Sequence, residues 1–566
     1  MTVTSISLHT RVKGKCRSFM PSQGVPARVP VLDTERHGEQ VRKTQFGSGN
    51  TASSLKKIMP RTYSHAPETH VPLPRPLPPK GAGGFLCSAR CLSPGSLSRG
   101  TSWTSGAATG TKEIVVLKEI VVNGVCSTGM QPHCNYACKR TQTVVFLHDY
   151  HMAKEAFTRP EFLNRPDWSI FKLMVSDNNA GVVGSNGATW HANRRFTLRQ
   201  LRDLGMGKSR MVSVVQREAQ CLVEELGKQA GRAAPVPHAL TVCVLNVLWQ
   251  LVASKRFSVD DPVILDLEMI IDDTLANMAR LTVPDFLPWL SCAFPLALQK
   301  RLFSLDILDV MKEKFSRFCQ DLIEEHKQAL DPSNPRDLID AYVIDLQERG
   351  SEDEAESIKD LSKLVFDMFT AGSETTTNTL TWMLYYLAAF PDVQRKMQQE
   401  VDRVLSKDAL PTLDDRPSLP YTEAVIHEVH RFASVTSMGV QHCASKDTLL
   451  AGFLIPKDAV VMSVVGSMHR DPRYWQDPDR FHPERWLDRQ GKFCAKQEGF
   501  LPFGVGKRRC VAESLVKMEL LIFAAVLVQK LDFSPPPGKL MDLRHDTRNP
   551  LCHLAKAQDI WVKFRS

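Results

Sequence analysis

One cysteine near the C-terminal end of the chain stands in a setting that favours chemistry. Cys510 lies within FLPFGVGKRRCVAESLVKMELLIF, residues 500–523, between a glycine-rich turn and an amphipathic helix pattern. A helix that begins near Val511 would direct its positive end at the sulfur. Three basic residues at 507–509 precede the cysteine, so we expect the thiolate form to be favoured. Most free cysteines are small buried hydrophobes, whereas a thiolate here would bind a metal or attack an electrophile.

A second chemically marked segment is the apolar stretch LVFDMFTAGSETTTNTLTWMLYYLAAF at 364–390, which a polar cluster interrupts. Serine, threonine and asparagine are weak helix formers, and Gly372 costs about 1 kcal/mol relative to alanine. The Thr375 hydroxyl can bond back to the carbonyl of Ala371, which loosens the helix and leaves a groove for dioxygen and water. Glu374 places an acid next to this alcohol. The structural alternative is a satisfied polar patch at a helix crossing.

Two further pairs have helical spacing. Glu428 and Arg431 are three residues apart, which is most often a surface ion pair worth about 0.2–0.5 kcal/mol. Trp190 and Arg194 are one turn apart, so an indole N–H and a guanidinium can converge on one anion. Packing plus a solvated charge is the more common explanation of such a pair.

The elements that would position these residues are mainly helical. Amphipathic segments are predicted at 190–204, 208–229, 238–254, 261–281, 305–330, 335–348, 358–390, 391–406, 421–432 and 511–530. Short strands are predicted between 433 and 465, in the repeated KEIVV at 112–116 and 118–122, and in TVVFL at 143–147. The fold class is therefore mainly α with small β-sheets.

Residues 1–140 differ in composition from residues 141–566. They hold 19 Lys and Arg against 6 Asp and Glu, whereas the remainder holds 52 against 56, so the net charge of +9 belongs to the head. The body therefore offers no argument for nucleic-acid binding. The head is rich in Ser, Thr, Gly and Pro and shows no sustained hydrophobic period up to about residue 110, which predicts disorder. Its basic start at 1–32 is also compatible with an organellar transit peptide.

The spacing of the cysteines argues against a disulfide framework and a zinc site, and the length of the apolar runs argues against a membrane-spanning helix. The fourteen cysteines lack paired spacings, which favours free thiols over a disulfide framework. Cys126, His133, Cys134 and Cys138 have the residue types of a zinc site but lack C-x-x-C spacing and a second half, which argues against zinc. The sequence contains no run of eighteen apolar residues and therefore predicts no membrane-spanning helix.

The segment 503–512 resembles the haem-ligand signature FxxGxRxCxG of the cytochrome P450 monooxygenases, with Ala512 where the family usually has glycine. Three further signatures follow the family's order. Residues 428–431 match its ExxR, residues 483–486 its PERF-type segment with Trp for Phe, and residues 371–376 its oxygen-binding helix. With WHANRR from Trp190 and GMGK from Gly205, the resemblance covers about 141–562 and is strongest to the microsomal, reductase-dependent branch.

The resemblance implies a role for each matched residue. Cys510 would be the axial thiolate ligand of the haem iron, with Phe503 packed beside the sulfur and Ala512 following it. Gly506 would supply a turn closed to residues with a Cβ, so that backbone N–H groups can point at the sulfur. The haem propionates would be held by Trp190, Arg194, Arg165, His442 and Arg508. A buried structural network under the haem would consist of Glu428, Arg431 and Arg485.

The implied activity is insertion of one oxygen atom of O2 into a lipophilic substrate, with haem b as cofactor. Glu374 and Thr375 would serve the proton relay. NADPH would supply electrons through NADPH–cytochrome P450 reductase, docked on a basic surface that includes Lys507, Arg509 and Lys517. The implied location is the cytoplasmic face of the endoplasmic reticulum membrane, with mitochondria as the alternative.

The substrate cavity is expected to be lined by three segments: Phe366 to Thr376, Ser434 to Val440, and a lid at 281–303. The lid is apolar, with Phe286 and Trp289 followed by Lys300 and Arg301, which suits partial insertion at a membrane surface. Ordinary core packing is the alternative.

Two other functions remain open at this point. A haem-thiolate isomerase or dehydratase would share the Cys510 loop but needs no acid and alcohol, so Glu374 and Thr375 argue against it. A nonfunctional haem-binding chain is suggested by the head, because 1–140 lacks the anchor and the proline-rich hinge adjoining it that the microsomal family has. The domains are thus an atypical region at 1–140 and a haem-thiolate catalytic domain at 141–566.

Overall fold

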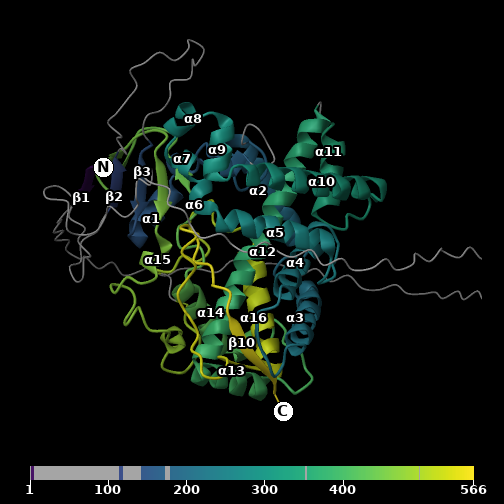
Figure 1. The fold of residues 1–566 in the computed structure, drawn as a ribbon. Coiled ribbons are helices and arrows are strands. Elements are labelled where there is room, and N and C mark those ends of the chain that lie inside the picture. Colours follow the sequence, from purple (N-terminus) through teal and green to yellow (C-terminus); the bar gives the residue numbers. More distant parts are fainter. Residues whose placement is uncertain are drawn as a thin grey trace, which may run out of the picture. The chain divides into compact units, whose positions relative to one another are not determined.

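The computed structural model describes residues 142–172, 179–350, 353–495 and 498–565, together with the strands β1 (Thr2–Ser5) and β2 (Ile114–Lys118) (Figure 1). The residues considered for a zinc site, Cys126, His133, Cys134 and Cys138, lie outside the described residues, as does nearly all of the head at 1–140. The composition of the head therefore remains the only basis for its predicted disorder.

The predicted helices form with bounds close to those expected. They are α2 (Gly187–Asp203), α3 (Val212–Gly227), α4 (Ala239–Val252), α5 (Pro262–Ala276), α6 (Met278–Leu281), α10 (Asp306–Gln328), α11 (Leu338–Arg349), α12 (Glu354–Ala389), α13 (Pro391–Val404), α14 (Pro420–Ala433) and α16 (Glu513–Lys530). Helices without a prediction are α1 (Tyr150–Thr158), α7 (Val283–Phe286), α8 (Trp289–Ala293), α9 (Leu296–Phe303) and α15 (Val465–Met468). The mainly α fold with small sheets is confirmed.

Three small sheets accompany the helices. The five-stranded sheet has the order β1-β2-β3-β8-β5, with β3 (Val144–Leu147), β8 (Val460–Ser463) and β5 (His442–Cys443), and only β3 and β8 pair in parallel. The other strands are β4 (Ala233–Pro235), β10 (Asp559–Phe564) and β9 (Leu531–Ser534) in one antiparallel sheet, and β6 (Thr448–Leu450) with β7 (Phe453–Ile455) in a hairpin. The strand predicted at 143–147 is confirmed as β3, and β2 falls within the KEIVV repeat.

Helix α12 runs through the centre of the catalytic body, with α4 beside it (Figure 1). Its apolar residues form part of the main core. At Gly372 a Cβ atom would lie 2.3 Å from Cδ2 of Leu248 on α4. The glycine that weakens the helix therefore has a packing reason, because it lets the two helices approach closely.

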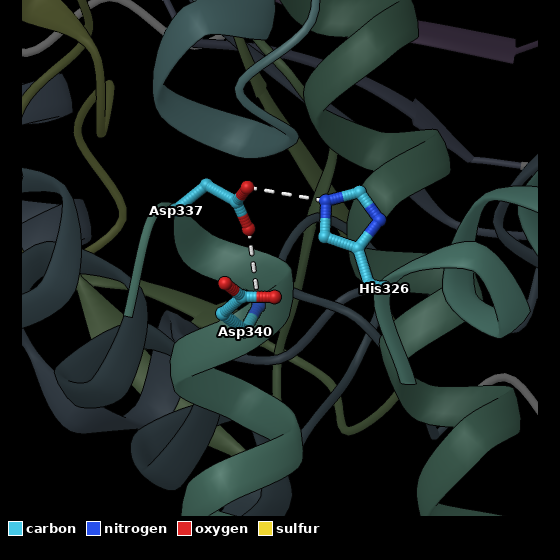
Figure 2. A group of neighbouring side chains, drawn as sticks. All are labelled: His326, Asp337 and Asp340. Carbon is cyan, nitrogen blue, oxygen red and sulfur yellow. Dashed lines mark hydrogen bonds and ion pairs between the residues drawn. The ribbon is translucent and has the colours of Figure 1, made fainter. Parts of the chain in front are cut away.

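A buried histidine ties the end of α10 to the start of α11 (Figure 2). Nε2 of His326 lies 3.1 Å from Oδ2 of Asp337, and both side chains are buried. Asp337 also caps α11 by accepting from the backbone N–H of Asp340, whose carboxylate is held by Arg336. Burial alone would lower the pKa of His326, but its hydrogen bond to Asp337 and the charge of Asp337 outweigh burial and raise the pKa.

We predict that this contact makes stability fall as the pH rises. Because the folded-state pKa of His326 is raised, its contribution is fully present below about pH 6.5 and is lost as the pH rises through the folded-state value. Asp337→Asn keeps a capping side chain but removes the charge. It should lower the free energy of unfolding by about 1–3 kcal/mol in acid solution and by less in alkaline solution. Urea unfolding midpoints of the wild type and the variant, in acid and in alkaline solution, measure this difference. An equal loss of stability in the two solutions would contradict the prediction.

Candidate active site

The cysteine loop is shaped by two glycines with positive φ. Gly506 has φ +80°, and a Cβ there would lie 2.0 Å from the carbonyl oxygen of Phe157. Gly504 has φ +71°, but its Cβ would meet nothing closer than 4.0 Å. The backbone N–H of Cys510 donates to the carbonyl of Phe503 at 2.9 Å and closes the loop. The turn expected at Gly506 is therefore required by a close approach to α1 as well as by its dihedral angle.

The electrostatics of Cys510 differ from the expectation. Burial among the surrounding atoms raises the pKa of the thiol, although the side chain is accessible where it faces a cavity. The backbone N–H groups of Ala512 and Glu513 oppose this, as expected for the start of α16, and so does the charge of Arg194. Residues 507–509 are not among the main causes of the shift. Without a bound metal the raised pKa thus favours the thiol, and metal binding would favour the thiolate.

Ala512 lies just before α16 with φ −94°, a value open to any residue. The family's glycine is thus not required at this position by the backbone.

A cavity of about 280 Å³ lies between this loop and α12. Cys510, Phe503 and Thr375 all line it. Thr375 Oγ1 donates to the carbonyl of Ala371 at 2.8 Å, which is the back-bond predicted from the sequence. Ala371 and Thr375 are exposed although they lie in the middle of a largely buried helix, because both face the cavity.

Four arginines line the same cavity: the exposed Arg509 and three that are buried or half-buried, Arg165, Arg194 and Arg508. Arg508 donates to the carbonyls of Leu163 and Ser185, and Arg165 donates to the carbonyls of Val183 and Gln441. The described residues give none of the three arginines a carboxylate partner within ion-pair distance. Burial, together with the neighbouring arginines, lowers the pKa of Arg508 to about 8 and that of Arg165 to about 9.

The residues around this cavity fit an anionic group that bears carboxylates. Buried cations without a counter-ion are costly. Trp190 is buried, lies under Arg508 with the guanidinium 4.2 Å from its ring centroid, and its Nε1 has no hydrogen-bond partner among the described residues. Two propionates would supply the missing charges and acceptors. The donor set thus fits haem, as does the sulfur of Cys510.

His442 has a different environment from the arginines. Its Nδ1 lies 2.6 Å from the carbonyl of Phe162, and its ring stacks on Phe157. Nε2 is therefore the ring nitrogen left for a ligand in the cavity that His442 lines. Burial, reinforced by the charges of Arg165 and Arg508, holds its pKa well below the usual range. A dianionic ligand would oppose this effect.

The Glu428 network is complete within the protein. Glu428 accepts two hydrogen bonds from Arg431, one from Arg485 and one from the backbone N–H of His482. Trp486 Nε1 also donates to Glu428 at 3.0 Å, which gives the tryptophan in the PERF-type segment a role that phenylalanine cannot fill. The structure thus brings together the three residues expected from the sequence.

Glu374 is not placed with Thr375. It does not line the cavity of Cys510 but a second pocket of about 190 Å³, together with Glu268 and Asp272 of α5. Burial, followed by the charge of Asp272, raises the pKa of Glu374 to about 7. Neighbours on a helix are about 100° apart, so the acid and the alcohol face different sides of α12.

Some site residues were not found from the sequence. Val183 and Ser185, whose carbonyls hold the arginines, belong to a segment tied to α12, where Asp367 accepts from the N–H groups of Val182 and Val183. His430 lines the cavity against Phe503 and has an unpartnered buried Nε2. The place of His430 within the ExxR segment was the only available signal.

One cavity thus brings together a cysteine sulfur, the back-bonded Thr375 and arginines without carboxylate partners among the described residues. This arrangement is typical of a haem-thiolate enzyme. A profile of the family described as "Cytochrome P450" matches residues 132–555. Similar proteins are cytochrome P450 2L1 of Panulirus argus (41% identity, covering 75% of this chain and 87% of that protein) and cytochrome P450 2J3 of Rattus norvegicus (36%, 71% and 80%). Farnesoate epoxidase of Bombyx mori is 34% identical over 70% of this chain and 79% of its own length. The chain belongs to the cytochrome P450 family, and it is a monooxygenase whose family cofactor is haem.

We predict that Gly506→Ala loses most of its haem, whereas Gly504→Ala keeps it. Both positions have positive φ, which costs a residue with a Cβ about 1–2 kcal/mol. Only position 506 adds a clash with the carbonyl of Phe157. The long-wavelength Soret band of the reduced, carbon monoxide-bound protein, expressed per mole of chain, measures correctly ligated haem. Equal bands in the two variants would contradict this account.

Proposed function

We propose that the protein inserts one atom of O2 into a lipophilic small molecule by hydroxylation or epoxidation. Electrons would come from NADPH through a flavoprotein reductase. The observation that carries the proposal is that Cys510, Thr375 and three unpaired guanidiniums line one cavity. Relatives named as cytochromes P450, and one named as a farnesoate epoxidase, support it.

In this proposal Cys510 holds the haem iron, with Phe503 beside the sulfur and Gly506 shaping the loop. Trp190, Arg165, Arg194, Arg508 and His442 hold the propionates. Haem bound there would supply the activation of dioxygen. The Glu428 network needs no ligand, because its hydrogen bonds are complete within the protein, so we assign it a structural role.

In this proposal two residues of α12, Thr375 and Glu374, deliver protons to the reaction. The hydroxyl of Thr375 faces the cavity and can hold a water there, while its own proton is donated to Ala371. Glu374, with a pKa of about 7, can exchange protons near neutral pH from the second pocket. The acid and the alcohol would then act from two sides of one helix, linked by water or by movement of the Glu374 side chain.

The proposed substrate is lipophilic because the cavity beyond the cysteine loop is largely apolar. Its apolar lining includes Val182, Leu248, Met368, Val435, Val440 and Val465. The expected lining by α12 and by 434–440 agrees with these positions, although Phe366 does not reach the cavity. None of the described cavity-lining residues comes from the lid at 281–303. The lid is therefore not proposed to select the substrate in this conformation.

The redox partner would dock on the face that carries Cys510. Lys507 and Arg509 are exposed there. Lys517 is a weaker candidate than expected, because its ammonium group pairs with Glu513 at 2.7 Å.

Membrane attachment is proposed to occur through the lid, at the cytoplasmic face of the endoplasmic reticulum. Within the described residues no helix is long and apolar enough to cross a bilayer. Phe286, expected to insert, instead packs on Trp168 at 4.8 Å between ring centroids. Among the described residues of the lid, the exposed large apolar side chains are three leucines of α9: Leu296, Leu298 and Leu302, which are 62%, 40% and 48% exposed.

We predict that Thr375→Ala will still bind haem and substrate and consume NADPH, but will divert electrons to hydrogen peroxide. The reason is loss of the hydroxyl that positions a proton-donating water. Thr370→Ala is a matched control, because Thr370 makes the same back-bond, to Phe366 at 2.9 Å, and does not line the cavity. Product and peroxide per NADPH are the measurements. A wild-type ratio in Thr375→Ala would show that this polar cluster is structural.

Glu374→Gln should slow turnover, since positioned acid–base groups are usually worth about 10²–10⁴-fold. The same variant should keep the thiolate Soret band. Unchanged turnover would remove Glu374 from the relay.

We predict that replacing Leu296, Leu298 and Leu302 with serine will release much of the protein from phosphatidylcholine vesicles. Interfacial binding scales with the apolar area that enters the bilayer. The control replaces the exposed Leu449 and Leu454 of the β6–β7 hairpin, which are 62% and 64% exposed. Co-sedimentation at low and high salt separates insertion from charge. Equal release by both sets of substitutions would contradict attachment through α9.

A further inference from the structure

The second pocket is a deep cleft with an acidic floor, which we call the carboxylate well. Its volume is about 190 Å³ and its floor carries Glu268 and Glu374, with the exposed Asp272 nearer solvent. Polar groups from α4 and α12 add Thr241, Thr377, Asn378, Thr381 and Tyr385. The remaining lining is His238 and the small or apolar residues Pro235, Val236, Pro237, Leu240, Ala555 and Ala557.

The well has a deficit of positive charge. Neither lysine nor arginine is among its described lining residues, and burial lowers the pKa of His238, so this ring is neutral at neutral pH. Burial first, and the neighbouring carboxyl of Glu374 second, raise the pKa of Glu268 to about 9. Three carboxyl groups thus share one cleft without a cation of the protein's own.

A buried polar atom outside the carboxyl cluster points to a missing ligand. Thr377 is 9% exposed, lines the well, and its Oγ1 has no hydrogen-bond partner among the described residues. Glu268 is 2% exposed and shares a hydrogen bond with the carboxyl of Glu374, while its Oε1 has no donor among the described residues. Buried polar atoms are rarely left without a partner. A cation with several N–H groups would satisfy the hydroxyl and the carboxyls together.

The chemistry of the walls selects an organic cation over a metal ion. The described residues whose ligand atoms converge as a metal requires are His326, Asp337 and Asp340, far along the chain from α5, and their atoms are already used in the α10–α11 contact. The well instead combines a carboxylate floor with proline, valine and leucine walls and the ring of Tyr385. An alkyl stem packs against such walls, and an ammonium group can also approach an aromatic face.

We propose that the carboxylate well binds a small alkylammonium ion, with its ammonium group among Glu268, Glu374 and Thr377 and its alkyl stem against the proline-rich wall. This site is separate from the cavity of Cys510 and does not depend on monooxygenase activity. Because Glu374 is shared, an occupant would hold the carboxyl of Glu374 ionised.

The test is calorimetric titration of the haem-loaded full chain with n-butylammonium chloride in phosphate buffer, since Tris is itself an amine. We expect a dissociation constant in the millimolar range or below and no measurable binding of n-butanol, which has the same shape without the charge. Glu268→Gln should weaken binding at least about tenfold. Asp273→Asn, which removes an exposed carboxyl one residue away from Asp272 and outside the well, should change it less than about twofold.

Asp272→Asn provides a second variant, which leaves the core unchanged because Asp272 is exposed, and it should weaken binding severalfold. The haem spectrum recorded in the same titration identifies any amine that ligates the iron. Binding that leaves the Soret band in place and weakens in Glu268→Gln and Asp272→Asn supports the proposal. It is overturned if n-butanol binds as well, if Mg²⁺ binds in place of the amine, if the amine binds only at the iron, or if no heat is released.

Discussion

The fold around the cysteine cavity depends on three guanidinium groups, Arg165 buried and Arg194 and Arg508 half-buried, which have no carboxylate partner among the described residues. Removing a charge from water is costly unless a partner of opposite charge replaces the solvent. Carbonyl oxygens of Leu163, Val183 and Ser185 accept hydrogen bonds from Arg165 and Arg508. What these arginines still lack, among the described residues, is a negatively charged partner. A dianionic haem would therefore be part of the folded core as much as a reagent.

The Glu428 network shows the opposite solution within the same fold. Its carboxylate accepts hydrogen bonds from Arg431, Arg485, Trp486 and the backbone N–H of His482. Arg431 also donates to the carbonyls of His469 and Pro478. Charge and hydrogen bonds are satisfied without a ligand. The Glu428 network thus needs no ligand, whereas in the proposed haem complex the arginines would gain their counter-charges from the cofactor. The two clusters would then divide the protein into a self-sufficient part and a part completed by its cofactor.

The sequence predicted the long helices and the cysteine loop well because their signals are local. Apolar periodicity sets α12 and α14, and the glycine at 506 is needed by its own dihedral angle. Burial depends on distant segments, so the raised pKa of Cys510 could not be foreseen from the basic run that precedes it. The contact of Phe286 with Trp168, more than one hundred residues earlier, could not be foreseen for the same reason.

Adjacency in sequence was the most misleading local signal. Glu374 and Thr375 are neighbours, but a helix separates successive side chains by about 100°. The alcohol faces the cavity of Cys510, and the acid faces a polar cleft shared with α5. The proton affinity of Glu374 is thus governed by burial and by Asp272 and Glu268, which do not line the cavity of Cys510. Because α12 forms a wall of both spaces, the proposed proton relay would make the reaction in one cavity depend on the charge in the other.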